Sequence, residues 1–159
     1  MATDYFLEID GIQGEATDKT HAGKIQLLSF GWGASNTGSF ATNSGGGAGK
    51  ATFSDFSFVM NINKASPELM LSCATGKHIA KAQLICRKAG EKQQEYMKVH
   101  FTDLLVSSYQ TSGASEIPTD SISLNFATVK YEYSPQKSDG TLGTTVIRGY
   151  DIKKQVKIG

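Results

Sequence analysis

The chain has 159 residues, a length that fits one domain, 1–159, with a single hydrophobic core. Its 16 basic and 15 acidic residues give a formal charge of +1, so composition provides no electrostatic footprint for nucleic acid or an anionic membrane. The sequence has no long apolar run, and residues 1–10 lack the basic and apolar regions of a signal peptide. We therefore expect no membrane insertion and a protein that starts in the cytoplasm.

Alternation of apolar and polar residues dominates the sequence and predicts a mainly β fold. Gly, Asp and Asn residues interrupt the alternation and divide it into segments. The strands predicted from it are residues 4–10, 24–30, 52–63, 79–87, 95–110, 120–134 and 144–158. Each strand should present one face to the core and the other to solvent.

Two local patterns refine this prediction. Residues 88–92 join two alternating segments and are typical of a hairpin connection in which Gly90 supplies a positive φ angle. Within residues 120–134 the apolar positions change phase by one residue after Phe126. The change indicates either a β-bulge or two strands divided by a short irregular piece, and the sequence leaves both possibilities open.

One short helix is predicted at residues 66–76. Ser66 can cap its N-terminus, Pro67 suits the first helical position, and Gly76 can end it. The apolar stripe expected to cover an opening or an edge of the sheet consists of Leu69, Met70, Cys73 and Ala74.

Residues 31–50 interrupt the β pattern and contain seven of the 17 glycines. A loop of about 20 residues is uncommon in a compact domain and is usually functional or disordered. The aromatic residues Trp32 and Phe40 argue against a plain linker. We expect an extended arm that becomes ordered against another surface.

The arm ends in residues 44–51, SGGGAGKA, which superficially match a phosphate-binding P-loop. That motif needs Gly at position 44 and a hydroxyl residue at position 51, where the chain has Ser44 and Ala51. The motif must also open a helix, whereas the alternation that follows predicts a strand. We therefore expect no nucleotide and no other cofactor.

Residue types that often serve catalysis are scattered along the chain. His21, His78 and His100 lie far apart and outside the usual metal-binding spacings. Cys73 and Cys86 form no C-x-x-C pair and lie among apolar residues, so both are predicted to be buried free thiols. The sequence thus predicts neither a metal site nor catalytic residues, and no enzyme activity.

Five segments, taken together in order and spacing, are more specific than any single motif. They are residues 4–33 (DYFLEIDGIQGEATDKTHAGKIQLLSFGWG), 44–78 (SGGGAGKATFSDFSFVMNINKASPELMLSCATGKH), 84–96 (LICRKAGEKQQEY), 106–113 (VSSYQTSG) and 122–136 (ISLNFATVKYEYSPQ). In these segments the chain resembles the haemolysin-coregulated protein (Hcp) family, the tube subunits of bacterial type VI secretion systems. The resemblance spans nearly the whole chain.

The resemblance implies a small β-barrel of two packed antiparallel sheets, with one short flanking α-helix and a long extended loop. It also implies a structural subunit whose homo-hexameric rings stack into a tube, which a contractile sheath propels from a baseplate. A spike protein caps the tube, and secreted effectors travel in its lumen. Such a subunit passes from the bacterial cytoplasm to the extracellular space or a target cell without a cleaved signal peptide.

In this family the long loop projects from the barrel and helps subunits or rings to meet. The glycines of the loop would then serve close backbone approach and mobility. The residues expected at ring or stacking interfaces are Trp32, Phe40, Ser44, Gly45, Gly46, Gly47, Gly49 and Lys50. Without the resemblance, the alternative is a monomeric β-barrel that binds a small ligand in its mouth.

Overall fold

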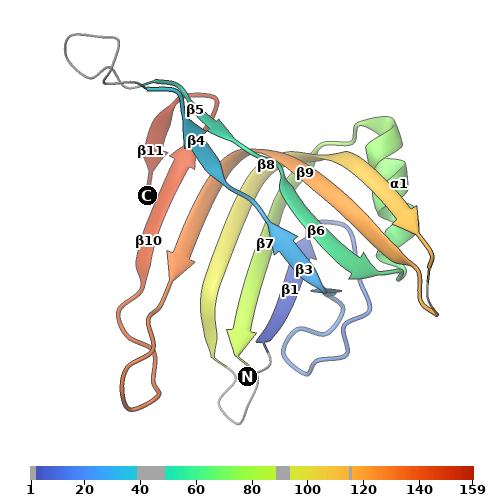
Figure 1. Cartoon of the computed structure of the whole chain (residues 1–159), viewed down its shortest axis with the longest axis horizontal. Coiled ribbons are helices and arrows are strands. Elements are labelled where there is room, and N and C mark those ends of the chain that lie inside the picture. Colours follow the sequence, from blue (N-terminus) through green and yellow to red (C-terminus); the bar gives the residue numbers. More distant parts are fainter. Residues whose placement is uncertain (1–2, 39–48, 89–93, 115) are drawn as a thin grey trace.

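The structure, a computed structural model, describes residues 3–38, 49–88, 94–114 and 116–159. Within these residues the strands are β1 (Thr3–Ile9), β2 (Ile25–Leu27), β3 (Ser29–Gly31), β4 (Ala34–Asn36), β5 (Ala51–Phe53), β6 (Phe56–Asn61), β7 (Ile79–Lys88), β8 (Glu95–Ser112), β9 (Thr119–Tyr133), β10 (Val146–Asp151) and β11 (Val156–Ile158). The helix α1 spans Ala65–Thr75. Figure 1 shows these strands wrapped around a core with α1 at one side, so the predicted mainly β class with one short helix is confirmed.

Two antiparallel sheets make up the fold. The main sheet has the order β11-β10-β9-β8-β7-β1-β2, with β6 paired to β9 and β3 paired to β6, and the second sheet is the pair β4 and β5. The chain changes partner at Leu28, whose N–H donates to the Val59 carbonyl at 2.8 Å, so β2 lies on β1 and β3 lies on β6. The sheet therefore curves back on itself but is not closed into a barrel, which corrects the barrel geometry implied by the resemblance.

Two long strands, β8 and β9, carry the sheet from one side of the core to the other. At the bend Asp103 of β8 has a φ angle of 50°, opposite Ala127 of β9. The buried positions change phase there, from Phe101 to Leu104 on β8 and from Val129 to Phe126 on β9. We call the side formed by β1, β7, residues 95–102 and 128–133, and β10 the charged wall. The side formed by β3, β6, residues 104–112 and 119–126 is the serine wall.

The phase change predicted in residues 120–134 therefore has a structural cause in the bend at Ala127. The strand β9 runs without interruption from Thr119 to Tyr133, so the alternative of two separate strands is wrong. The register shift between β8 and β9 lies at Ser107 of β8, between Val106 and Ser108. A sequence alternation cannot reveal on which of two paired strands an extra residue sits.

Three predicted strands are divided in the structure. Residues 24–30 form β2 and β3, residues 52–63 lie in β5 and β6, and residues 144–158 lie in β10 and β11. The other predicted strands match to within two residues. The predicted hairpin is present at its ends, where the Lys88 N–H donates to the Gln94 carbonyl at 3.0 Å, and its connection, including Gly90, lies outside the described residues.

The helix ends as predicted but begins differently. Gly76 has a φ angle of 66° and its N–H donates to the Ser72 carbonyl. Ser66 does not cap, because its hydroxyl donates to Asp120 Oδ2 at 2.5 Å, and Asn63 Oδ1 accepts the Ala65 N–H instead. The face that the helix packs on the sheet therefore differs from the predicted apolar stripe. Leu69 is buried, whereas Met70 and Ala74 of that stripe are exposed.

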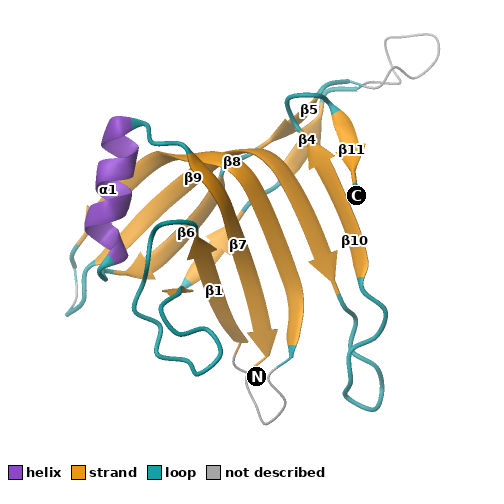
Figure 2. Cartoon of the chain, turned by 180° about the vertical axis from the view of Figure 1, so that it is seen from behind, coloured by secondary structure: helices purple, strands orange, loops and turns teal. Residues whose placement is uncertain are grey.

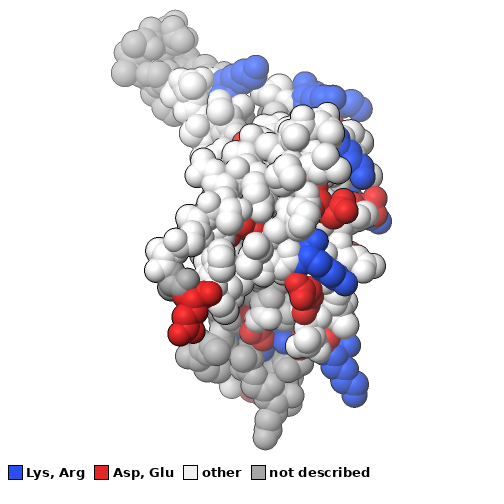
Figure 3. Space-filling model, turned by 90° about the vertical axis from the view of Figure 1, so that its right-hand side faces the viewer, with Lys and Arg blue, Asp and Glu red and all other residues white. Residues whose placement is uncertain are grey.

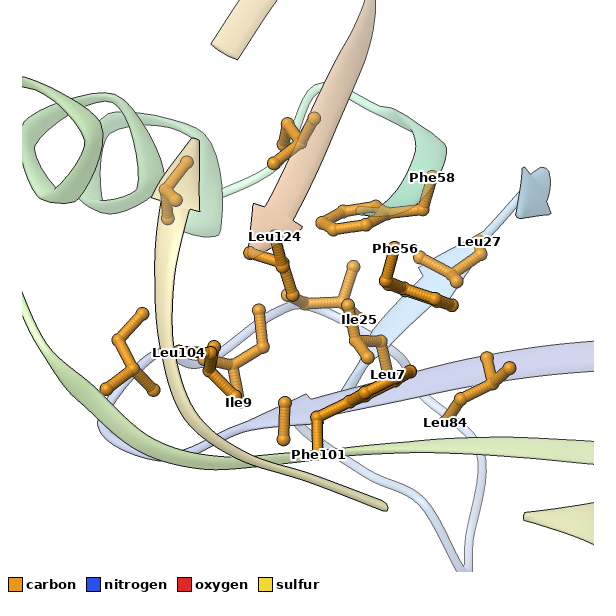
Figure 4. Close-up of a cluster of buried hydrophobic side chains, with 14 of the residues drawn as sticks. Leu7, Ile9, Ile25, Leu27, Phe56, Phe58, Leu84, Phe101, Leu104 and Leu124 are labelled. Atoms are coloured by element: carbon orange, nitrogen blue, oxygen red, sulfur yellow. The ribbon is translucent and has the colours of Figure 1, made fainter. Parts of the chain in front are cut away.

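Aromatic side chains fill the space between the two walls (Figure 4). The rings of Phe101 and Phe126 lie 4.6 Å apart between centroids, and those of Phe56 and Phe101 lie 5.0 Å apart. The largest fully buried side chains are Phe6, Phe56, Phe58, Phe101, Leu7, Ile25, Met60, Leu69, Leu84, Leu104, Ile122 and Leu124. Burial of apolar area at this scale drives the folding of the chain.

Candidate assembly surfaces

The predicted arm, residues 31–50, is only partly a loop. Its base is a two-stranded ribbon in which β4 pairs with β5, with Ser35 opposite Thr52. Figure 1 shows this ribbon leading away from the main sheet. Of the expected interface residues, Trp32, Gly49 and Lys50 are described, and the others, Phe40, Ser44, Gly45, Gly46 and Gly47, lie outside the described residues.

Gly49 lies where two backbone segments approach each other. A Cβ atom on this residue would lie 2.1 Å from the Gly38 nitrogen and 2.5 Å from the Thr37 carbonyl carbon. The Asn36 side chain holds both segments, since its Nδ2 donates to the Gly49 carbonyl at 3.1 Å and its Oδ1 accepts the Gly38 N–H at 2.7 Å. Only glycine fits this close approach. Lys50 beside it is exposed.

Trp32 anchors the start of the arm to the core. Its ring lies 5.4 Å from that of Tyr131 and 6.2 Å from that of Phe101, and the side chain is partly buried. On the other strand of the ribbon, Phe53 stacks on Tyr150 at 5.7 Å. These contacts fix the direction in which the ribbon leaves the sheet. Trp32 thus has an internal structural role, and its role at an interface stays a prediction.

Hydroxyl side chains cover the exposed face of the serine wall. The strand pairings align five serines, together with Gly31, Val59 and Gln110, in two rows across β3, β6, β9 and β8. The first row is Gly31, Ser57, Ser123 and Ser108, and the second is Ser29, Val59, Ser121 and Gln110. Together they line a shallow hollow of about 400 Å³. In this hollow the hydroxyls of Ser57 and Ser123 lie 3.2 Å apart.

The carboxylate of Asp55, at the edge of the serine wall, accepts two side-chain hydrogen bonds. Asp55 accepts from the Ser107 hydroxyl at 2.6 Å and from Asn125 Nδ2 at 2.9 Å. Figure 3 views the molecule from the side of α1, and most of its surface toward β3 and β6 is uncharged. Basic and acidic side chains gather on the opposite flank of this view, and the outward positions of the charged wall include Glu8, Lys81 and Lys130. The bent sheet therefore presents two surfaces of different chemistry.

A buried guanidinium organises the charged wall. Arg87 donates to Asp18 through two nitrogens at 2.8 and 2.9 Å and to Asp4 at 3.0 Å, and it lies over the Phe6 ring. The bidentate bond to Arg87 holds the pKa of the Asp18 carboxyl well below its usual range. Because Asp18 belongs to the loop between β1 and β2, this bond fastens that loop to β7.

His21 belongs to the same loop and is buried. Its ring stacks on Phe6 with centroids 4.8 Å apart, Lys24 Nζ lies 2.9 Å from its Nδ1, and Glu95 lies 3.4 Å from its Nε2. Burial, and then the nearby Lys24 charge, lowers the pKa of this imidazole. The contact with the lysine requires Nδ1 to be the acceptor, so the neutral ring is the form that fits.

The described residues offer no arrangement typical of a metal centre. No group of three or more His, Cys, Asp or Glu residues converges among them. His78 pairs with Asp103 at 2.9 Å at the surface, and His100 contacts Glu132. Within the same residues, no helix has the length and apolarity that a membrane crossing requires.

The cysteines are both free, and they differ in burial. Cys86 is buried, as predicted, and burial raises the pKa of its thiol to about 12, which makes it unreactive. Cys73 is only half-buried, because α1 turns its polar Ser66 and Ser72 toward the core. The prediction of a buried thiol is therefore right for Cys86 and only partly right for Cys73.

Sequence analysis missed both surfaces just described. The serine rows had a detectable signal, because Ser121 and Ser123 alternate with Ile122 and Leu124 on β9. The Arg87 cluster had none, since its carboxylates lie 69 and 83 residues away along the chain. The alternative of a ligand-binding monomer expects an open barrel mouth, whereas the described interior contains a cluster of buried apolar side chains.

Comparison with known proteins identifies relatives along the whole chain. The family model described as "Type VI secretion system effector, Hcp" matches residues 6–133. The protein named hcp1 of Pseudomonas aeruginosa is 44% identical over 161 residues, which cover 99% of this chain and 99% of that protein.

Solved structures of type VI secretion proteins also match the chain. The crystal structure of Hcp1 from Salmonella typhimurium matches with a TM-score of 0.80 and 38% identity, over 99% of this chain and 100% of that one. A structure described as a type six secretion system protein matches with a TM-score of 0.93 and 28% identity, over the same shares. A type VI secretion system effector from Yersinia pestis matches with a TM-score of 0.77 and 34% identity, over 93% and 99% of the two chains.

Proposed function

Because the chain belongs to the Hcp family of type VI secretion proteins, we propose that it is a structural subunit whose six-membered rings stack into a secreted tube. The subunit acts without catalysis. A ring needs heterologous contacts that close after a fixed rotation, whereas stacking of rings is open-ended and yields a tube. The formal charge of +1 supports this proposal, since a large net charge would oppose the packing of identical copies.

The serine wall is the surface that lines the lumen in this proposal. The observation that carries it is the pair of rows across β3, β6, β9 and β8, which consist mostly of serines and contain no charged residue. Hydroxyl and amide groups bond water and varied cargo with little preference for charge. A lumen of this chemistry suits a carrier of effectors that differ in sequence.

The arm supplies contacts between subunits or rings in the same proposal. The described part of its ribbon is fixed to the sheet by Trp32 and Phe53, and the Gly49 approach keeps its two strands together. The further partners are the spike protein at the tube tip, the contractile sheath, the baseplate and secreted effectors. The subunit starts in the bacterial cytoplasm and leaves with the tube for the extracellular space or a target cell.

The first test is the native mass of the purified protein, measured by light scattering on a sizing column and followed by negative-stain imaging of the same peak. We expect a species of about six times the 17.1 kDa chain with ring-shaped projections. A stable monomer at high concentration would contradict the proposal. That result would favour the alternative of a monomeric protein that binds a small ligand.

Labelling of engineered cysteines tests which wall faces the lumen. In a Cys73→Ser background, Ser121→Cys places a thiol on the serine wall and Gln83→Cys places a matched thiol on the charged wall. A small maleimide should label both in assembled rings. A long polyethylene glycol maleimide should label Gln83→Cys fully and Ser121→Cys only in part, because chains crowded into a lumen exclude one another. Full labelling of both by the long reagent would overturn the assignment.

A further inference from the structure

The outer face of the charged wall contains a hollow that is larger than the one on the serine wall. It has a volume of about 1100 Å³. Its floor consists of side chains in two rows that cross β1, β7, β8 and β9. The first row is Glu8, Gln83, His100 and Lys130, and the second is Lys81, Thr102 and Thr128.

Two raised sides turn this floor into a groove. On one side stand residues 11–13 and 22–24 from the loop between β1 and β2, which Arg87 fastens through Asp18. On the other side stands Ile158 of β11, which lies over Gly149 of β10. Figure 2 shows this face toward the viewer, from β1 across to β10. Both sides are held by the fold, so the groove is preformed.

Some charged side chains of the groove form ion pairs with a carboxylate, and others do not. Lys24 lies 3.5 Å from Glu8, and His100 contacts Glu132. Among the described residues, the ammonium groups of Lys81 and Lys130 have no carboxylate within ion-pair distance. Asp10 lines the end of the groove next to the loop and adds a negative charge there. The central floor therefore carries two unpaired positive charges.

The spacing of these two lysines limits what can bind. Lys81 lies on β7 and Lys130 on β9, two strands away and two residues along, which places their Cα atoms roughly 12 Å apart. Carboxylates two turns apart on an α-helix, about 11 Å, match that spacing. Between the lysines, the hydroxyls of Thr102 and Thr128 bond to each other and keep further capacity for a ligand.

We propose that this groove is a docking site for an acidic segment of another protein, with carboxylates on Lys81 and Lys130 and polar groups on the threonine hydroxyls between them. A phosphate polymer fits less well. The lining of the groove includes lysines rather than the guanidinium groups suited to bidentate phosphate binding.

The site lies on the face opposite the serine wall and does not depend on ring formation. Its test uses an oligoglutamate peptide labelled with a fluorophore, with anisotropy measured at physiological ionic strength. The variant K81Q/K130Q should weaken binding about tenfold, since it removes both carboxylate contacts. The matched control K153Q/K154Q removes the same charge from the exposed turn between β10 and β11 and should weaken binding less than about twofold.

Charge reversal provides a second arm of the experiment. The variant K81E/K130E should lose the oligoglutamate peptide and gain an oligolysine peptide, whereas an oligoglutamine peptide should bind neither protein. Equal weakening in the groove variant and the control variant would overturn the proposal, as would equal binding of oligoglutamine. Displacement of the peptide by inorganic triphosphate or single-stranded DNA at lower concentration would also overturn it, in favour of a phosphate ligand. Native mass, measured in parallel, shows separately whether ring formation is intact.

Discussion

The two walls of the bent sheet share strands β8 and β9 but differ in how they are stabilised. The charged wall fastens a loop through a buried arginine and a buried histidine, and it has a preformed groove on its outer face. The outer face of the serine wall has exposed side-chain bonds, such as those between Ser57 and Ser123 and between Asp55 and Ser107. One pair of strands can therefore support a surface with many fixed charges and a nearly neutral surface. The reason is the bend at Asp103, where the positions that face the core change phase along both strands.

The largest effect should come from removing the centre of the charged wall. Arg87→Met leaves Asp4 and Asp18 without their partner, so we expect the free energy of unfolding to fall by about 3–5 kcal/mol. Urea denaturation at fixed protein concentration measures this change. The control Lys88→Met removes a neighbouring charge whose Nζ donates to Gln136 at the surface and lies 5.9 Å from the centroid of the Tyr96 ring, and it should cost less than about 1 kcal/mol. Similar losses in both variants would contradict the role of Arg87.

A smaller effect is expected at the side of the groove. Gly149→Ala places a Cβ 3.0 Å from the Ile158 carbonyl oxygen and 3.1 Å from that of Val129, which forces β11 away from the sheet. We expect a loss of about 1–3 kcal/mol in the same denaturation experiment. Gly113→Ala, after the serine-wall end of β8, meets only Pro118 at 3.8 Å and should be nearly neutral. If Gly149→Ala is as stable as Gly113→Ala, the side of the groove is not tightly packed.

Acid should weaken the charged wall before the serine wall. The pKa of His21 is lowered in the fold, so the unfolded chain takes up a proton first and stability falls as the pH drops below the usual histidine value. The pKa of Asp18 is also lowered, so its contribution is present above the usual aspartate value and is lost as the pH falls below it. Hydrogen exchange of β7 amides against β6 amides, measured from neutral to acid pH, follows both losses.

His21→Gln should flatten the part of this pH dependence that lies just below neutral. The matched control is His78→Gln, because His78 is exposed and lies outside the buried cluster. This variant leaves the contacts of His21 with Phe6 and Lys24 in place, so the fall in stability just below neutral pH should remain. An unchanged profile for His21→Gln would show that the buried imidazole does not set the acid sensitivity of this wall.

The smallest effect is expected on the serine wall. Ser57→Ala combined with Ser123→Ala removes one hydroxyl pair from the exposed surface, and water can replace the lost bonds of the surrounding groups. We expect the free energy of unfolding to change by less than about 1 kcal/mol. A loss of more than about 2 kcal/mol would mean that the serine rows stabilise the fold, and it would remove the contrast between the two walls.

Sequence alone determined the elements that depend on local chemistry. Alternating apolar residues predicted the mainly β class, Gly76 predicted the end of the helix, and the order of segments from residue 4 to residue 136 indicated the family. These features survive in any tertiary context because they rest on side-chain periodicity, a left-handed backbone angle and an inherited order of residues.

Only the tertiary structure decided how these elements combine. Alternation says which residues share a face but not where a strand changes partner, so the switch at Leu28 was not predicted, and only the phase change on β9 indicated the bend at Asp103. The Ser66 hydroxyl donates to Asp120, 54 residues away along the chain, and does not cap its own helix. The Arg87 cluster, the serine rows and the groove each join residues distant in the chain. Their chemistry arises from pairing across strands, which no local pattern encodes.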